Sequence, residues 1–244
     1  MLPRLLLEFY AVLVGLIVGS FVNVVIHRLP RGRSFVLPRS RCPWCGSAIA
    51  ARDNIPVLSY LLLRGRCRHC TAPISPRYPL VEALMGGLYL ACFERFGSTL
   101  YAVAAAIFCA FLVALALTDL EHLLLPDALT FSGMAAGLLL QPWLPATATE
   151  AVVGMLAGAG SLFLIAELWL WARGEEGMGL GDAKLMAMVG AFLGWQGAVT
   201  TLFFGIVSGG LVGIAMLLAG RRGWKSRLPL GMFLGFGALV ALFT

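Results

Sequence analysis

Long apolar segments separated by short polar ones occupy most of this 244-residue chain. The first covers roughly residues 5–26, and seven more follow after a polar stretch, at residues 80–96, 100–118, 123–143, 151–171, 183–195, 198–219 and 230–243. Apolar segments of about 20 residues are long enough to cross a bilayer as helices. The pattern therefore predicts an all-α polytopic membrane protein with about eight transmembrane helices, of which the run at 183–195 is the shortest.

Composition agrees with this prediction, because hydrophobic residues make up 60% of the chain, charged residues 12%, and the mean hydropathy is +0.90. Residues 1–26 lack a small-residue cleavage site, so we expect them to remain as the first transmembrane helix. Small residues spaced four apart predict closely packed helices at Gly133/Gly137, Gly154/Gly158, Gly205/Gly209 and Gly231/Gly235.

The segment at residues 27–78 differs sharply from its surroundings. It holds ten arginines and many prolines against the single acid Asp53, which is typical of an extramembrane insert with little helix. We therefore expect three parts: a first transmembrane helix at 1–26, an insert at 27–78 and a transmembrane helical core at 79–244.

The net charge of +6 and the pI of about 9.3 raise the question of a nucleic-acid partner. The positive residues cluster in loops, so we expect no nucleic acid and instead contacts with anionic lipid headgroups. If successive spans cross the membrane in alternating directions, most basic residues lie on the same side of it. They are those of the insert, Arg173, Lys184, Arg221, Arg222, Lys225 and Arg227. The positive-inside rule predicts that this side is cytoplasmic.

Two aspartates stand at ends of apolar segments, and the same threading places both on the cytoplasmic side. Asp119 ends one run, and Asp182 belongs to the glycine-rich stretch Gly177-Met178-Gly179-Leu180-Gly181-Asp182-Ala183-Lys184-Leu185. Either residue alone can be a helix cap or a boundary residue. Together, two carboxylates at one membrane face can share a proton and activate a water molecule. The glycines make a turn that a simple cap does not need.

Four of the six cysteines form two pairs, Cys42/Cys45 and Cys67/Cys70. Two such knuckles can meet around one tetrahedral zinc ion, so we predict a zinc-ribbon-like insert with these four ligands. His69 lies inside the second pair and can replace a cysteine ligand. Reduced, metal-free thiols or a redox pair are the alternatives.

Several motifs resemble those of bacterial type IV prepilin peptidases, the Gly-x-Gly-Asp membrane aspartyl proteases that also act as N-methyltransferases. They are residues 19–30, Asn54-Ile55-Pro56, Arg64-Gly65-Arg66-Cys67, residues 77–82, Asp119-Leu120-Glu121-His122, Leu125-Pro126-Asp127 and residues 179–184. The final segment, residues 229–235, departs from the family pattern, which puts substrate contacts there in doubt.

The resemblance implies an inner-membrane endopeptidase with its active site facing the cytoplasm. Such an enzyme removes the leader of type IV prepilins and type II secretion pseudopilins after a glycine, and many members then methylate the new amino terminus with S-adenosylmethionine. By the family's motifs the catalytic pair is Asp119 and Asp182, supported by a loop containing Gly179, Gly181 and Lys184. The residues carry no nucleotide-binding fingerprint, so the methyl donor rests on the resemblance alone.

The positions of the two aspartates at helix ends suggest different roles. Asp119 is expected at the carboxyl end of a helix and Asp182 at the amino end of another, so we expect Asp119 to hold the shared proton. The alternative function is a transporter or secretion-channel subunit with a zinc docking module, because paired carboxylates in membranes also suit proton relays.

Overall fold

The structure is a computed structural model that describes residues 2–37, 39–174, 179–219 and 228–244. Gly177 and Met178 of the glycine-rich stretch, and the basic residues Arg221, Arg222, Lys225 and Arg227, lie outside the described residues. The described residues form helices joined by loops and hold no strand, only two isolated β-bridges in the insert. The predicted all-α fold is confirmed.

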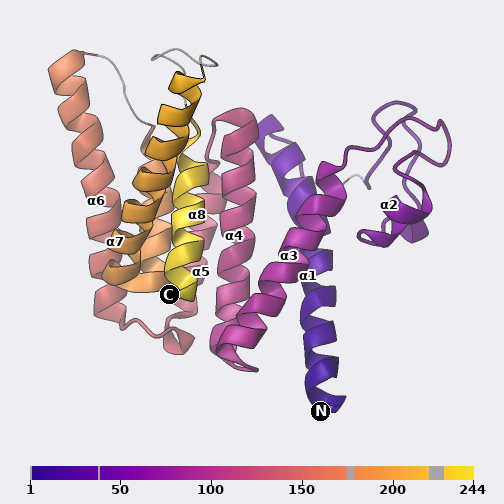
Figure 1. Ribbon diagram of the computed structural model, residues 1–244, viewed down its shortest axis with the longest axis horizontal. Helices are drawn as coiled ribbons and strands as arrows, with labels where there is room; N and C mark the ends of the chain where they lie inside the picture. Colours follow the sequence, from indigo (N-terminus) through magenta and orange to yellow (C-terminus); the bar gives the residue numbers. More distant parts are fainter. Residues whose placement is uncertain (1, 38, 175–178, 220–227) are drawn as a thin grey trace. The chain divides into compact units, whose positions relative to one another are not determined.

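The chain divides into two compact units, residues 1–110 and residues 111–244. The first unit contains α1 (Leu2–Arg28), the short α2 (Leu58–Leu62), α3 (Arg77–Phe96) and the beginning of α4 (Leu100–His122). The second contains the end of α4, α5 (Asp127–Leu139), α6 (Ala148–Arg173), α7 (Leu180–Leu218) and α8 (Leu230–Phe243) (Figure 1).

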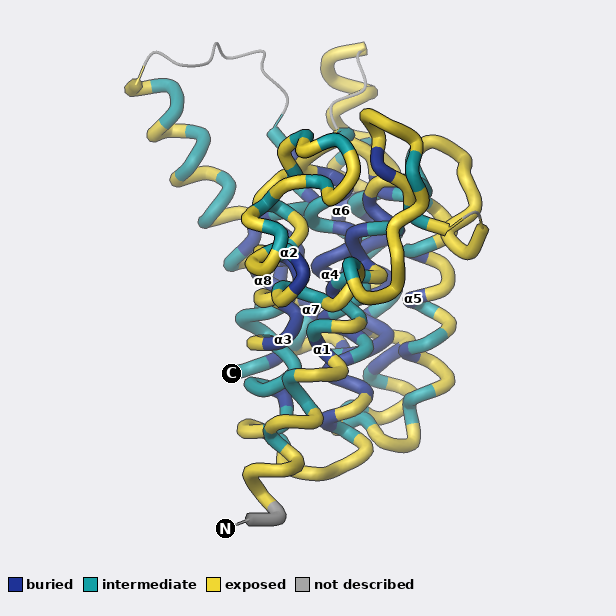
Figure 2. The backbone as a smooth tube through the Cα atoms, turned by 90° about the vertical axis from the view of Figure 1, so that its right-hand side faces the viewer, coloured by how far each residue is buried: buried dark blue, intermediate teal, exposed yellow. Residues whose placement is uncertain are grey.

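In the first unit, α1 packs closely against α3. A Cβ atom at Gly15 would lie 2.6 Å from the backbone oxygen of Met85, and one at Gly19 would lie 2.7 Å from Cα of Glu82. Such distances leave room only for glycine, so the two backbones touch at these positions. Figure 2 shows the amino-terminal part of α1 exposed, whereas residues 22–26 include the buried Val22, Asn23 and Ile26.

In the second unit, the amino-terminal part of α7 is the central element, because residues 185–192 are buried without interruption. Close contacts of glycines on α5 and α6 surround it: a Cβ at Gly133 would meet Met188, and one at Gly154 would lie 2.4 Å from the carbonyl carbon of Gly194. Helix α8 packs against the later part of α7, where Gly237 contacts Thr201.

Helix α7 combines two of the predicted apolar runs. Gly194 has φ 67° and ψ −170°, a backbone conformation that interrupts the helix and that residues with a side chain rarely adopt. The chain turns back at this residue, so the two parts of α7 run in opposite directions (Figure 1). The separate runs at 183–195 and 198–219 are therefore two helical segments.

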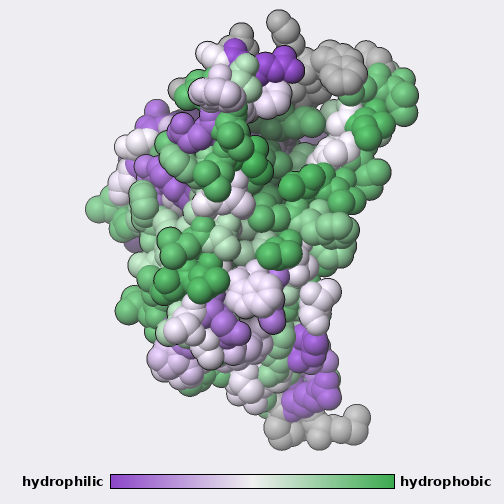
Figure 3. Space-filling view, turned by 90° about the vertical axis from the view of Figure 1, so that its left-hand side faces the viewer, coloured by the Kyte–Doolittle hydropathy of each residue, from purple (hydrophilic) through white to green (hydrophobic). Residues whose placement is uncertain are grey.

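Four helices of the described residues are long and apolar enough to cross a membrane: α1, α4, α6 and α7. Helices α5 and α8 are apolar but shorter. Large hydrophobic side chains are exposed on these helices, such as Leu156 and Phe203, and hydrophobic areas cover much of the α6 side shown in Figure 3. A membrane protein is thus confirmed, while the count of eight crossings stays a prediction.

Candidate active site and metal centre

Asp119 lies in the last turn of α4 and is buried, with 7% of its surface exposed. Its Oδ2 accepts a hydrogen bond of 3.1 Å from the backbone N–H of Met232, in the first turn of α8. The Asp119 carboxylate therefore sits against the amino end of a helix, where free N–H groups favour a negative charge.

Asp182 is the third residue of α7 and is half-buried. The helix begins after Gly179, whose oxygen accepts a hydrogen bond of 3.3 Å from the backbone N–H of Asp182. Among the described residues, the atom nearest to a Cβ at Gly179 would be 4.0 Å away. Gly179 and Leu180 are exposed at the beginning of α7, while residues 185–192 are buried.

Leu125, in the loop between α4 and α5, links the two aspartates. A Cβ at Gly181, next to Asp182, would lie 3.0 Å from Cβ of Leu125. A Cβ at Gly231 would lie 3.1 Å from Leu125 and 2.9 Å from Oδ2 of Asp119. The structure therefore places the helix ends that carry Asp119 and Asp182 against the same residue, Leu125, inside the second unit.

Lys184 ties two of these helix ends together. Its Nζ donates a hydrogen bond of 2.6 Å to Oδ1 of Asp127, the first residue of α5, and lies 5.3 Å from the ring centre of Phe131. The ion pair joins the beginnings of α5 and α7, directly beside Leu125 and Asp182. Lys184 was expected to support the active-site loop, whereas no role was expected for Asp127, although it stands in the Leu-Pro-Asp motif.

No contact with Asp119 was expected for Gly231 and Met232. Gly231 was expected to be a packing residue, and residues 229–235 depart from the family pattern. The signal in the sequence was Pro229 directly before an apolar run, because proline is common at the beginning of helices. Nothing in the local pattern indicates that this helix begins against Asp119, because the two are 113 residues apart.

The four predicted cysteine ligands come together in the first unit. The sulfur atoms of Cys42, Cys45, Cys67 and Cys70 all lie within 4.8 Å of one another, and those of Cys42 and Cys70 are 3.8 Å apart. Tetrahedral zinc with Zn–S bonds of about 2.3 Å requires S–S distances of about 3.8 Å. The cluster consists of four sulfur atoms without His69, and its geometry fits zinc.

Each cysteine pair is shaped by the same backbone turn. The N–H of Cys42 donates to the oxygen of Ser47, and the N–H of Cys67 donates to the oxygen of Ala72, both at 2.9 Å. These bonds fold each knuckle so that both sulfur atoms face the other pair. Hydrogen bonding with Ser47 lowers the pKa of Cys45 to about 6, which favours the thiolate that a metal binds.

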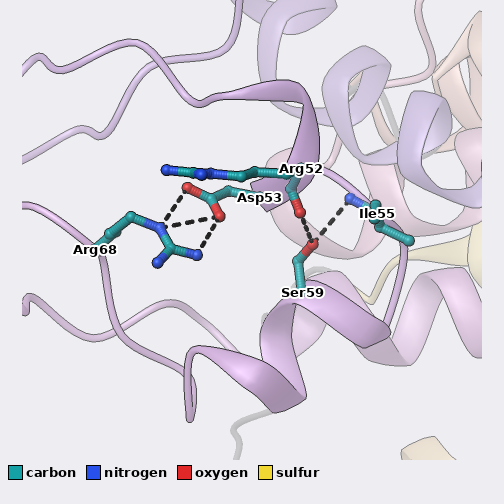
Figure 4. A network of polar contacts seen from close by, with 5 residues as sticks. All are labelled: Arg52, Asp53, Ile55, Ser59 and Arg68. Atoms are coloured by element: carbon teal, nitrogen blue, oxygen red, sulfur yellow. Dashed lines mark hydrogen bonds and ion pairs between the residues drawn. The ribbon is translucent and has the colours of Figure 1, made fainter.

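A polar network fixes the loop that follows the first knuckle (Figure 4). Arg68 donates to both oxygens of Asp53, with the shortest contact at 2.6 Å, and this holds the pKa of Asp53 below its usual value. The hydroxyl of Ser59 donates to the oxygen of Arg52 and accepts from the N–H of Ile55. The second knuckle and the loop at residues 51–59 are thereby joined.

Two family models match this chain, one within the first unit and one mostly within the second. Residues 13–96 match the bacterial peptidase A24 N-terminal domain, and residues 106–214 match the type IV leader peptidase family. The first match contains the four cysteines, and the second contains both aspartates.

Similar proteins cover nearly the whole chain. One from Burkholderia pseudomallei is 40% identical over 96% of this chain and 84% of its own length, and one from Pseudomonas aeruginosa is 38% identical over 95% and 88%. A third, from Myxococcus xanthus, is 48% identical over 86% of this chain and 63% of its own length. All three are named prepilin leader peptidase/N-methyltransferase. No solved structure matches the chain. At this identity and coverage, the chain belongs to the type IV leader peptidase family.

Proposed function

We propose that this protein is a membrane aspartyl endopeptidase that removes the leader peptide of prepilins and then methylates the new amino terminus. One observation supports the peptidase activity: the helix ends that carry Asp119 and Asp182, far apart in the sequence, both pack against Leu125. The names of the similar proteins support both activities. The transporter or channel alternative finds no support among them.

The two carboxylates suit general acid–base hydrolysis of a peptide bond. The ionised aspartate takes a proton from a water molecule as its oxygen attacks the scissile carbonyl carbon, and the protonated aspartate donates to the carbonyl oxygen. The nitrogen of the leaving amine is then protonated as the C–N bond breaks. Asp119 faces the amino end of α8 and Asp182 lies in the first turn of α7, so helix dipoles no longer assign the shared proton to Asp119.

The chain's apolar helices and basic loops support a location in the bacterial inner membrane. In this proposal the aspartates and the insert at 27–78 face the cytoplasm, between a first transmembrane helix at 1–26 and a helical core at 79–244. The substrates are type IV prepilins and type II secretion pseudopilins, cut after a glycine. The exposed arginines of the insert contact anionic lipid headgroups, and no nucleic acid takes part.

Two further components complete the proposal. Zinc, held by Cys42, Cys45, Cys67 and Cys70, stabilises an insert that has few buried apolar residues of its own. S-adenosylmethionine supplies the methyl group. Gly181 packs closely against Leu125 next to Asp182, Gly179 is exposed at the start of the helix, and Lys184 fixes this turn against α5.

Cleavage of a purified prepilin, followed by mass spectrometry of the product, tests the proposal. Asp119→Asn and Asp182→Asn should each lose cleavage by about a thousandfold or more, because a carboxylate of the pair cannot be replaced by an amide in proton transfer. Glu167→Gln removes an exposed acid from α6 and serves as the control. Near-normal cleavage by either aspartate variant would disprove the assignment, and a product without an added methyl group would remove the second activity.

A further inference from the structure

The first unit contains a cavity of about 450 Å³ between α1, the insert and α3. Its walls include Asn23 and His27 of α1, Trp44 and the cysteine knuckles of the insert, and Tyr78 and Glu82 of α3. Cavities of roughly 300–1,000 Å³ are typical of sites for small organic molecules. This cavity belongs to the first unit, which contains the four cysteines, whereas Asp119 and Asp182 belong to the second unit.

Asn23 is a buried amide at the wall of this cavity, with 1% of its surface exposed. Its Nδ2 donates to the backbone oxygens of Gly19 and Tyr78, at 3.3 and 3.1 Å. Its Oδ1 is buried and has no hydrogen-bond partner among the described residues. A buried acceptor without a partner is unfavourable, so this oxygen gains a partner if a bound molecule brings a donor to the wall that Asn23 forms.

Two carboxylates, Asp53 of the insert and Glu82 of α3, line the same cavity together with Arg28, Arg41 and Arg68. Glu82 is buried, and its Oε2 accepts a hydrogen bond of 2.7 Å from the backbone N–H of Val57. Val57 has φ 59°, a conformation that β-branched residues rarely adopt, so the loop is held in a strained form at this contact. Asp53 is held in place by Arg68. These contacts fix both acids in a shaped site rather than leaving them to solvent.

The chemistry of this lining fits an adenosyl sulfonium compound. Carboxylates attract a sulfonium or ammonium cation and accept hydrogen bonds from ribose hydroxyls, and an amide oxygen accepts from the amino group of adenine. Trp44, Tyr60 and Tyr78 provide aromatic faces in the same lining. We propose that this cavity binds the methyl donor S-adenosylmethionine, with Asn23 and Glu82 as contact residues, an inference that rests on the N-methyltransferase half of the proposed function.

The knuckles form one wall of the cavity, since Cys42, Cys67 and His69 belong to its lining. Zinc would then hold this wall in place without touching the donor. Asp119 and Asp182 are not part of the lining, so donor binding here does not involve the candidate catalytic pair.

Isothermal titration of S-adenosylmethionine into the full-length protein in lipid nanodiscs tests the proposal directly. Asn23→Leu removes the unpaired oxygen, and Glu82→Gln removes the charge while keeping an oxygen that can accept from Val57. Both should weaken binding by about tenfold or more. Glu94→Gln is the matched control, because Glu94 lies on the same helix, is exposed, and is outside the cavity. Its affinity should equal that of the unaltered protein.

A second titration with S-adenosylhomocysteine separates charge from shape. Glu82→Gln should weaken the neutral thioether less than the sulfonium compound, and Asn23→Leu should weaken both alike. Zinc content and helical circular dichroism show that each variant is folded.

The outcomes distinguish this inference from the proposed function. Equal binding by both variants and the unaltered protein would place the donor elsewhere and overturn the inference, while methylation of the cleaved prepilin stands. Failure of the unaltered protein to bind the donor overturns the inference as well. If the cleaved prepilin also remains unmethylated, the N-methyltransferase half of the proposed function falls with it.

Discussion

Asp119 and Met232 are joined by a hydrogen bond of 3.1 Å between the carboxylate and a backbone N–H, which links the end of α4 to the beginning of α8. The contact is possible because residue 231 is a glycine, since a Cβ there would lie 2.9 Å from Oδ2 of Asp119. Helix α8, the last of the chain, is thus a direct support of a candidate catalytic residue.

Gly231→Ala should therefore impair peptide cleavage. The added methyl group must displace the Asp119 carboxylate or Leu125, and a shift of this kind in a catalytic group costs on the order of tenfold to a hundredfold in kcat/KM. Gly210→Ala is the control, because a Cβ there meets no atom within 4 Å. The steady-state rate of prepilin cleavage is measured for both variants. Equal rates would show that the position of Asp119 does not depend on its close contact with Gly231.

The ion pair between Lys184 and Asp127 should position the beginning of α7 for cleavage. Lys184→Met and Asp127→Asn should each reduce kcat by several-fold to about tenfold with little loss of stability, because exposed ion pairs contribute roughly 0–1 kcal/mol. A double-mutant cycle on kcat is the measurement, and the double variant should be no worse than the worse single one. Additive losses would mean that the two residues act separately. Glu94→Gln, which breaks an exposed pair with Arg4, is the control.

The helices could be predicted from the sequence because their signals are local. Each apolar run corresponds to a helical segment, and Gly154 and Gly205 lie at close helix contacts as their spacing predicted. The cysteine cluster was equally accessible, since two short pairs with the right spacing leave few ways to arrange four thiolates.

The contacts that build the candidate active site could not be predicted in the same way. Met232 meets Asp119 across 113 residues, and Lys184 meets Asp127 across 57. Both pairs depend on which helix ends pack together. The same polar residue types occur at helix ends whether they cap the helix, form ion pairs or take part in catalysis. The turn in α7 was placed a few residues late because Gly194 resembles any other glycine of an apolar run until its φ of 67° is known.

Removal of zinc should loosen the insert. The unaltered protein should contain one zinc ion per chain, and Cys42→Ala and Cys67→Ala should lose it, because each removes one of four ligands. Metal content by mass spectrometry measures this. Cys109→Ala is the control, since Cys109 is buried near Cys92 rather than in the cluster.

Limited digestion with trypsin gives an independent measurement, because the insert is rich in arginine. Chelation or either cluster variant should speed cleavage between residues 29 and 76, and added zinc should slow it only where all four cysteines are present. An insert that resists trypsin equally with and without metal would show that zinc does not stabilise it.

The crossing of α6 and the first part of α7 should be the most sensitive packing contact of the second unit. A Cβ at Gly190 would lie 2.2 Å from the carbonyl carbon of Gly154 and 2.3 Å from the nitrogen of Met155. Both are backbone atoms and cannot rotate away, so Gly190→Ala must push the two helices apart. Forced overpacking of this kind costs about 1–3 kcal/mol of folding stability. Because α7 carries Asp182, cleavage should fall together with the Tm.

Gly160→Ala is the matched control on α6, where a Cβ meets no atom within 4 Å. It should leave the Tm unchanged or raise it slightly, since alanine favours a helix more than glycine does. Thermal unfolding followed by circular dichroism in detergent compares the two variants. A Gly190→Ala protein as stable as the Gly160→Ala protein would mean that α6 and α7 do not cross at Gly154 and Gly190, and the support of Asp182 by this crossing would fall with it.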